Sequence, residues 1–359
     1  MVTNQPIPQA EPDLAYCHEA IRGVSRTFAL TVEELDEPMD DYISVGYLLC
    51  RVADTIEDAS HIPAETQRSL LRRFDAALDP TDDTTIRAFA DAVEEWLPPE
   101  GDRNDDWTVV SRAPTVFATF AAFDAPTQAA IRPSVREMVV GMETFLERYA
   151  DRPGIRIQRY VELERYSHFV AGTVGTLITN LLGRAAVAPD RMQTMERTAE
   201  GFGRLLQLVN IAKDVGADAA EEDNVYLPAE WLHEEGVDPE ELLDPSNEDG
   251  VARVIERVVD RARSYLDDGL AYLEAMPLHS GNTLAAWAVP YLLAVGTLRE
   301  LERRPRDALT RTGVKISRKE VFAVLEAAPS TDREDIASLQ ATISREPLHE
   351  SDWCPIRST

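Results

Sequence analysis

The sequence predicts an all-α protein, and three observations support this class. Apolar residues recur with a period of about 3.6 along most of the chain, as on the buried face of a helix. Strand-like alternation is scarce, and the periodic stretches are separated by polar segments rich in proline and glycine. Because 44% of the residues are hydrophobic, the chain can bury a core and wholesale disorder is not expected.

Breaks in the periodic pattern mark, in the order of the chain, where each predicted helix ends. Pro63 separates the second predicted helix from the third, and DPTDD (79–83) separates the third from the fourth. LPPEGDRNDD (97–106) and DRPG (151–154) follow the fourth and the fifth, and EEGVDPEELLDPSNEDG (234–250) precedes the eighth. The predicted helices cover residues 12–34, 41–59, 64–78, 84–97, 125–149, 159–183, 190–220, 248–275, 281–304 and 318–327.

These helices are expected to form one domain. The connections are polar and have lengths typical of packed helices, and neither a repeat nor a long linker divides the chain. We therefore predict a helical domain over residues 12–330, preceded by a disordered head (1–11) and followed by a polar tail (331–359).

The cellular setting follows from the ends of the chain and its cysteines. The N-terminal MVTNQPIPQAEPD lacks the basic and apolar regions of a signal peptide, and the apolar stretch 283–298 is short for a membrane span and contains Pro290. We expect that stretch to be a buried helix, and any membrane contact to be peripheral. Three cysteines without a CxxC pair indicate a reducing, cytoplasmic location.

The charge balance excludes one class of partner. A formal net charge of −28 and a pI of about 4.6 leave no basic stripe for phosphate contacts, so a nucleic-acid binder is not expected. The chain has only three lysines, Lys213, Lys315 and Lys319, among 36 basic residues. Excess acid with little lysine is typical of proteins adapted to high salt, although a GC-rich genome also favours arginine.

Two clusters of carboxylates stand out against this acidic background. Asp54, Glu57 and Asp58 lie within the apolar segment YLLCRVADTIEDA (47–59), and Asp214 and Asp218 end the apolar run LLQLVNIAKDVGADA (205–219). Residues three or four apart share one helix face, where like charges repel unless a cation binds. Carboxylates beside a basic residue suit Mg²⁺ and a diphosphate. The alternative is a solvated surface, since the chain has 64 acidic residues.

Five motifs in order resemble those of the squalene and phytoene synthase family, the head-to-head prenyl synthases. RVADTIED (51–58) and NIAKDVGAD (210–218) resemble its two aspartate-rich motifs. SRTFAL (25–30) resembles the N-terminal flap, YSHFVAGTVG (166–175) the central tyrosine helix, and NVYLPAEWL (224–232) the segment after the second aspartate motif. The resemblance implies the all-α isoprenoid synthase fold, with a central cavity between the two aspartate-rich helices.

The resemblance also assigns roles to residues. It implies that two prenyl diphosphates bind in the cavity with Mg²⁺ and that Tyr166 assists ionisation and proton loss. The metal ligands implied are Asp54, Glu57, Asp58, Asp214 and Asp218. The residues implied in binding substrate or diphosphate are Ser25, Arg26, Phe28, Tyr47, Arg51, Gln207, Asn210 and Lys213. Apolar residues behind the motifs that could form a dry cavity, or simply core, are Val170, Ala171, Gly172, Val174, Gly175, Leu206 and Val209.

Within the family the details favour the squalene synthase type, which condenses two farnesyl diphosphates and reduces the product with NADPH. The ending DTIED and the segment GVKISRKEV (313–321) resemble squalene synthases, in which the second segment contributes to NADPH binding; this implies Lys315 and Arg318 as cofactor contacts. Lys213, Asn224 and Ser317 depart from the pattern, each standing where the family commonly has arginine or another basic residue. Alternatives are a phytoene or dehydrosqualene synthase, which lacks the hydride step, and a non-catalytic helical assembly factor.

Overall fold

The computed structural model describes residues 10–353, except the side chains of Arg26 and Thr27. Within that range every extended element is helical, and the sole β-feature is an isolated bridge between Arg156 and Val225. The predicted all-α class is therefore confirmed. The α-helices are α1 (Leu14–Val24), α2 (Arg26–Glu33), α3 (Met39–Glu57), α4 (Ala64–Leu78), α5 (Ile86–Val93), α6 (Asp105–Ser111), α7 (Ala113–Ala122), α8 (Ala125–Arg148), α9 (Tyr160–Ser167), α10 (Thr173–Leu182), α11 (Pro189–Ala217), α12 (Ala229–Glu234), α13 (Glu248–Arg263), α14 (Leu266–Ala275), α15 (Leu284–Arg303), α16 (Arg318–Ala327) and α17 (Arg333–Ile343).

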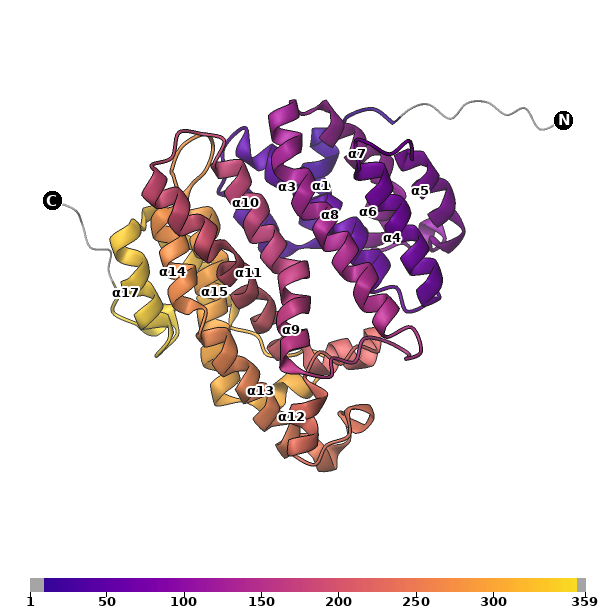
Figure 1. Ribbon diagram of the computed structural model, residues 1–359. Helices are drawn as coiled ribbons and strands as arrows, with labels where there is room; N and C mark the ends of the chain where they lie inside the picture. The colour runs from indigo at the N-terminus through magenta and orange to yellow at the C-terminus, as the bar shows by residue number, and fades with distance from the viewer. Residues whose placement is uncertain (1–9, 354–359) are drawn as a thin grey trace.

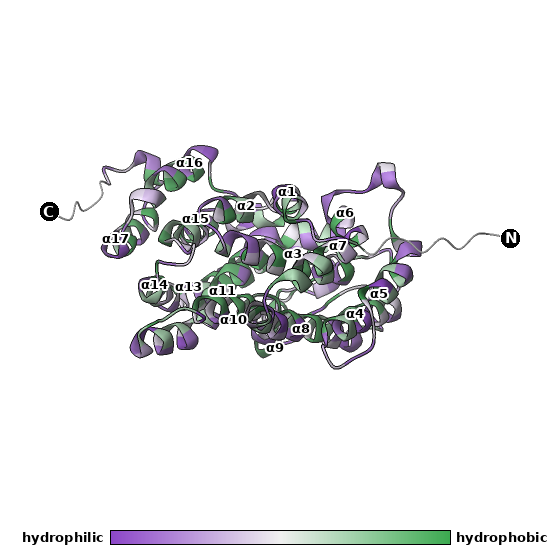
Figure 2. Cartoon of the chain, turned by 90° about the horizontal axis from the view of Figure 1, so that it is seen from above, coloured by the Kyte–Doolittle hydropathy of each residue, from purple (hydrophilic) through white to green (hydrophobic). Residues whose placement is uncertain are grey.

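The helices form two groups joined by a central pair. Helices α1 and α3–α8 lie on one side of the molecule, and α13–α15 and α17 lie on the other (Figure 1). Between them α10 packs against both α8 and α11, while α11 packs against α13, α14 and α15. Hydrophilic residues colour the outer turns and loops in Figure 2. The long helix α3 therefore belongs to the first group, and α11 belongs to the central pair that joins the two groups.

Glycines let the central helices approach closely. A Cβ on Gly175 of α10 would collide with the carbonyl oxygen of Ala199, and one on Gly203 of α11 would collide with that of Ala171. Only a residue without a side chain permits such backbone contact. Gly175 thus has the packing role that its position in an apolar helix suggested.

The apolar stretch 283–298 lies in α15, and the prediction of a buried helix is confirmed. Among the described residues α15 is the one helix long and apolar enough to cross a bilayer, and 83% of its most apolar window is buried inside the protein. It packs against α2, α11, α13 and α17. Its apolar composition is accounted for by these neighbours.

Several predicted helices are interrupted where the local backbone changes. Residues 12–34 form α1 and α2 because Ser25 is extended and its hydroxyl accepts a hydrogen bond from the Phe28 N–H, which caps α2. Residues 159–183 form α9 and α10 around a π-helical turn at His168–Gly172. A second π-helical turn, Asp218–Glu222, continues α11. Residues 248–275 divide into α13 and α14.

Three helices before residue 330, α6, α7 and α12, arise where the periodic pattern predicts none. Helices α6 and α7 occupy part of the interval 98–124, with the Asn104 side chain capping α6 at the Trp107 N–H. Short helices of this kind obtain most of their stability from packing, which for α6 and α7 is against α3, so their own pattern is weak.

The predicted polar tail requires correction. Residues 333–343 form α17, which starts with a capping box at Asp332 and buries Ile336, Leu339 and Ile343. It packs against α14 and α15, so the folded part of the chain extends past residue 330. The last residues of the predicted tail and most of the predicted head lie outside the described residues.

Candidate active site

A cavity between α3 and α11 has two adjacent chambers. The acidic chamber has a volume of about 830 Å³, and the apolar chamber about 290 Å³. Both chambers touch the same nine residues, which therefore mark the junction between them: Phe28, Thr31, Tyr47, Arg51, Asp54, Leu206, Gln207, Asn210 and Pro290. The molecule thus combines a polar and an apolar compartment in one site.

The two predicted carboxylate clusters meet at the acidic chamber. Asp54 and Asp58 line it from the C-terminal end of α3, while Asp214 and Asp218 line it from the end of α11 and the π-turn that follows. Two apolar side chains of α3, Val52 before Asp54 and Ile56 after it, are fully buried, which fixes the direction of the acidic face. Residues about 160 positions apart thereby face one space.

Glu57 lies behind the lining of the chamber. Its side chain is buried, with 5% of the residue exposed, and its Oε2 accepts a hydrogen bond of 3.2 Å from the Tyr166 hydroxyl. Its Oε1 is buried and has no hydrogen-bond partner among the described residues. A buried carboxylate oxygen without a donor is costly, and a cation is one group that could satisfy it.

Two basic side chains offset part of the negative charge. Arg51 forms an ion pair with Asp54 through Nη1 and donates from Nε to Asp106 at 2.7 Å. Lys213 forms an ion pair with the adjacent Asp214. Both Arg51 and Lys213 line the acidic chamber. They stand where they can also contact an anion bound there.

The pKa values of several carboxylates in this region are raised, which favours their neutral forms. Burial, followed by the carboxylate of Asp54, raises the pKa of Glu57 to about 8. Burial, followed by Glu222, raises the pKa of Asp218 to about 8. Burial and Asp54 also raise the pKa of Asp58 well above its ordinary value. The repulsion shows that these groups share a region short of positive charge.

The residues present fit a magnesium site. The donor set is carboxylate oxygen, the ligand type that Mg²⁺ prefers. Five carboxylates line the chamber together with Arg51 and Lys213, and a sixth lies behind its wall with an unpartnered buried oxygen. The carboxylates are Asp54, Glu57, Asp58, Asp214, Asp218 and Glu222. Divalent cations would supply the missing positive charge.

Tyr166 occupies the centre of a buried hydrogen-bond network. Its hydroxyl lies 3.1 Å from the hydroxyl of Tyr226, and the two rings are stacked with centroids 4.9 Å apart. The Asn224 side chain donates to the Tyr226 hydroxyl at 3.1 Å and accepts from the Ile155 N–H at 2.8 Å. Burial, followed by the charge of Glu57, raises the pKa of Tyr166 well above its ordinary value, so the phenol is neutral.

The apolar chamber contains most of the apolar residues that the sequence singled out. Phe28 stacks on Tyr47 with ring centroids 4.0 Å apart, at the junction with the acidic chamber. Gln207 and Asn210 line both chambers, whereas Val209 lines the acidic chamber alone. Gly172 lines neither. The apolar wall otherwise includes Cys50, Val170, Ala171, Val174, Gly175, Phe202, Leu206 and Trp287.

The flap motif is placed beside the same site. Ser25 lines the acidic chamber and caps α2. Arg26 begins α2, but its side chain lies outside the described residues. The proposed role of Arg26 therefore stays a prediction.

Of the two predicted NADPH contacts, Lys315 and Arg318, one lines the acidic chamber and the other does not. Lys315 lines the acidic chamber from the loop before α16, and this loop is attached to α11 by a hydrogen bond of 3.0 Å from the Val314 N–H to the Lys213 carbonyl. Gly313 has a φ of +59° and lies against that carbonyl, where a side chain would collide. Arg318 is exposed on the first turn of α16 and does not line the chamber.

Sequence reasoning missed residues of the site that stand near its motifs. Glu222 lines the acidic chamber four residues after Asp218, a spacing that could have suggested it. Tyr226 also lines the chamber, within the motif NVYLPAEWL. Asp106, the second partner of Arg51, had no signal because it comes from a segment in which no helix is predicted.

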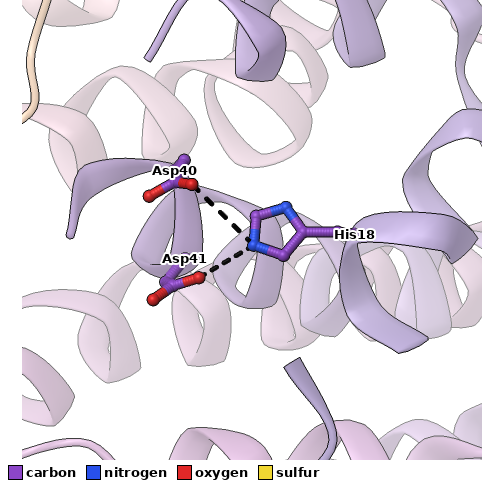
Figure 3. Close-up of side chains that lie close together, drawn as sticks. All are labelled: His18, Asp40 and Asp41. Atoms are coloured by element: carbon purple, nitrogen blue, oxygen red, sulfur yellow. Dashed lines mark hydrogen bonds and ion pairs between the residues drawn. The ribbon is translucent and has the colours of Figure 1, made fainter. Parts of the chain in front are cut away.

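A further cluster of potential metal ligands lies outside the cavity. His18 Nε2 lies 2.8 Å from Asp41 Oδ1 and 4.0 Å from Asp40 Oδ2, and the three ligand atoms fall within 4.8 Å of one another (Figure 3). His18 is on α1 and the two aspartates are in the first turn of α3. None of the three lines either chamber. The contact attaches α1 to the start of α3.

Comparisons with known proteins agree with this geometry. The sequence profile of the squalene/phytoene synthase family matches residues 21–320. The chain is 27% identical to a lycopaoctaene synthase of Botryococcus braunii over 322 residues, covering 89% of this chain and 67% of the relative. It is 27% identical to a squalene synthase of Saccharomyces cerevisiae over 290 residues, covering 80% of this chain and 61% of the relative. The chain thus spans about three fifths to two thirds of the length of these relatives.

Solved structures share the fold. A complex of TcSQS with the ligand BPH1237 superposes with a TM-score of 0.77 at 24% identity, covering 92% of this chain and 89% of the other. A dehydrosqualene synthase bound to a ligand superposes with a TM-score of 0.61 at 20% identity, covering 88% of this chain and 95% of the other. The helical architecture is that of the isoprenoid synthase fold. With its profile matched over most of the chain, the protein belongs to the squalene/phytoene synthase family, a family of prenyltransferases.

Proposed function

We propose that the protein condenses two molecules of farnesyl diphosphate head-to-head and reduces the product to squalene with NADPH. The observation that carries this proposal is the pairing of an acidic chamber with an apolar one. A prenyl diphosphate has the same division, since its charged head needs cations and its hydrocarbon tail needs a dry pocket. The motifs DTIED and GVKISRKEV favour squalene as the product.

The acidic chamber is suited to removing a diphosphate group. Mg²⁺ bound by Asp54, Asp58, Asp214 and Asp218 would neutralise the diphosphate and make it a better leaving group. Glu57 supports these ligands from behind. Arg51 and Lys213 contribute further positive charge, and Lys213 acts as a point charge because it lacks the fork of an arginine.

The apolar chamber protects the cation that ionisation produces. The double bond of the second prenyl chain attacks the allylic carbon, and loss of a proton closes a cyclopropane ring. Water in this space would capture the cation, so the apolar wall favours condensation over hydrolysis. Phe28 and Tyr47, at the junction of the chambers, are placed to hold the reacting carbons near the diphosphate.

Tyr166 is the residue best placed to assist proton loss. Its neutral hydroxyl lines the acidic chamber, and Glu57 and Tyr226 hold it by hydrogen bonds. The phenol can pass a proton released by the substrate on to the departing diphosphate, because its oxygen receives one proton as it gives up its own. After a second ionisation opens the cyclopropane, NADPH would supply the hydride that quenches the cation, and Lys315, on the chamber wall, would help to hold this cofactor.

Product analysis tests the proposal and its nearest rival. The purified protein is incubated with farnesyl diphosphate and Mg²⁺, with and without NADPH. Squalene formed only with NADPH supports the proposal. Dehydrosqualene formed regardless of NADPH, or turnover of the C20 diphosphate alone, would assign the phytoene or dehydrosqualene type. No turnover of either diphosphate would favour a non-catalytic helical protein.

Removal of one carboxylate from each cluster tests the metal assignment. The double variant Asp54→Asn, Asp218→Asn should lose turnover, because neither helix retains its full ligand set. Asp83→Asn is the matched control, since Asp83 is exposed and does not line the chamber. Wild-type turnover in the double variant would refute the assignment.

A further inference from the structure

The π-helical turn after α11 directs one extra carboxylate into the acidic chamber. Residues Asp218–Glu222 form this turn, and the Asp223 N–H donates to the Asp218 carbonyl across it. Asp223 then takes a left-handed conformation with a φ of 58°, which ends the turn. Glu222 lines the chamber, whereas its neighbour Glu221 is exposed. Turns of this type occur mostly as single insertions in helices, frequently at functional sites.

Glu222 borders the same chamber as both carboxylate clusters. The chamber wall includes Asp54 and Asp58 from α3 and Asp214 and Asp218 from the end of α11 and the π-helical turn. Glu222 closes this turn four residues after Asp218 and is partly buried. Its carboxylate therefore belongs to the wall that the two clusters share.

The hydrogen bonds of Glu222 do not account for its position. The one hydrogen bond recorded for its side chain comes from Asn224 Nδ2 at 3.5 Å, the outer limit for such a bond. The same Asn224 nitrogen donates to the Tyr226 hydroxyl at 3.1 Å, so one of its two hydrogens at most remains for Glu222. A carboxylate can accept about four hydrogen bonds, so Glu222 retains free acceptor capacity.

An independent observation indicates that this region binds a cation. Glu57 is buried, with 5% of the residue exposed, and its Oε1 has no partner among the described residues. Glu57 accepts a hydrogen bond from Tyr166, which lines the chamber together with Asp54 and Glu222, so the orphaned oxygen belongs to a side chain directly behind the chamber wall. A bound cation would both coordinate the unpartnered buried oxygen and offset the excess negative charge of the carboxylates.

We propose that Glu222 is an additional ligand for the divalent cation held between Asp54 and Asp218. This adds a residue outside the two aspartate-rich motifs, and it rests on the proposed function in taking that cation to be the one that assists diphosphate departure. With Glu222 the second helix offers three carboxylates, Asp214, Asp218 and Glu222, against Asp54 and Asp58 from the first. The additional negative ligand tightens binding of the cation before any diphosphate arrives.

Direct measurement of cation binding tests this proposal. Protein freed of metal with EDTA is titrated with Mn²⁺ alone, and free Mn²⁺ is followed by electron paramagnetic resonance; a second series adds inorganic diphosphate. Glu222→Gln should bind Mn²⁺ at least about tenfold more weakly than wild type, as expected for loss of a group that holds a metal. Glu221→Gln, the matched control on the same turn, should bind like wild type. Glu222→Asp should recover part of the affinity.

Thermal unfolding separates a ligand role from a structural one. Without metal, Glu222→Gln should unfold at the wild-type temperature or higher, because a repelling charge is removed. The rise in Tm that Mn²⁺ produces in wild type should shrink in this variant. Wild-type Mn²⁺ affinity in Glu222→Gln, or equal weakening in Glu222→Gln and Glu221→Gln, would overturn the proposal. Since no prenyl substrate is present, failure of the proposed function on farnesyl diphosphate would leave these results intact.

Discussion

At the scale of single residues, the candidate active site is defined by carboxylates held in unfavourable surroundings. Glu57 is buried against a phenol, and Asp218 and Glu222 repel each other across one turn. Such groups reduce the stability of the metal-free protein, because they resist ionisation in the folded state. Their presence in the chamber makes sense if cations compensate the charge.

The unfavourable burial and repulsion of these carboxylates should make the stability of the metal-free protein depend on pH. The folded-state pKa of Glu57 and Asp218 is about 8, against ordinary values of 4.5 and 3.8. Since the folded state keeps protons that the unfolded chain releases, the free energy of unfolding contributed by these groups is greatest at low pH and declines as pH rises toward 8.

The measurement is urea unfolding in EDTA at pH 5 and pH 8. Wild type should lose more stability between these values than the double variant Glu57→Gln, Asp218→Asn, which lacks both groups. Carboxylates elsewhere whose pKa is lowered, such as Asp124, are common to both proteins and cancel in the difference. Equal pH dependence in the two proteins would show that the groups are not shifted.

At the scale of elements, the end of α3 depends on a residue of α4. The last carbonyls of a helix lack partners within it. Gln67 Nε2 donates to the carbonyls of Ile56, Glu57 and Ala59 at 2.9, 2.7 and 3.2 Å, and Gln67 is buried. One amide group therefore holds the turn from which Glu57 and Asp58 project.

Replacement of Gln67 should weaken both the fold and the site. Gln67→Met keeps the shape but leaves buried carbonyls unsatisfied, at a cost of about 1–3 kcal/mol in the free energy of unfolding. Cation affinity should also fall, because the ligands of α3 lose their support. Urea unfolding and Mn²⁺ titration give the two values. Gln193→Met, an exposed position on α11, should change stability by less than about 0.5 kcal/mol; a similar effect at both positions would contradict this role.

At the scale of the whole molecule, a buried ion pair connects the last three α-helices. Arg299 of α15 donates to both carboxylate oxygens of Glu320 on α16 at 2.7 Å and to the Ile343 carbonyl of α17 at 2.8 Å. The side chains of Arg299 and Glu320 are each 2% exposed. This connection holds α16 and the loop that carries Lys315 against the cavity.

Breaking the pair from one side should be more harmful than removing both partners. Arg299→Met leaves Glu320 buried without its cation, which typically costs about 3–5 kcal/mol. The double variant Arg299→Met, Glu320→Leu removes the uncompensated charge and should recover much of that loss, as measured by urea unfolding. A double variant no more stable than Arg299→Met would indicate that the geometry of the pair, and not its charge, matters.

The helices and the two carboxylate clusters were predictable from the sequence because both depend on local spacing. The 3.6-residue period marks the long helices, and residues three or four apart on a helix share a face wherever that helix packs. For this reason the sequence alone assigns Asp54, Asp58, Asp214 and Asp218 to two acidic faces. The helices α6, α7, α12 and α17 escaped prediction because packing against other helices stabilises them.

The arrangement of the site depended on long-range packing. Packing between distant parts of the chain places α3 and α11 around one cavity, directs Glu57 toward Tyr166, and puts Glu222 and Tyr226 on the chamber wall. Nothing in the spacing of YLLCRVADTIEDA indicates which carboxylate faces the cavity and which lies behind it. A short segment determines which residues share a face, but the space that the face borders is formed by helices far away in the chain.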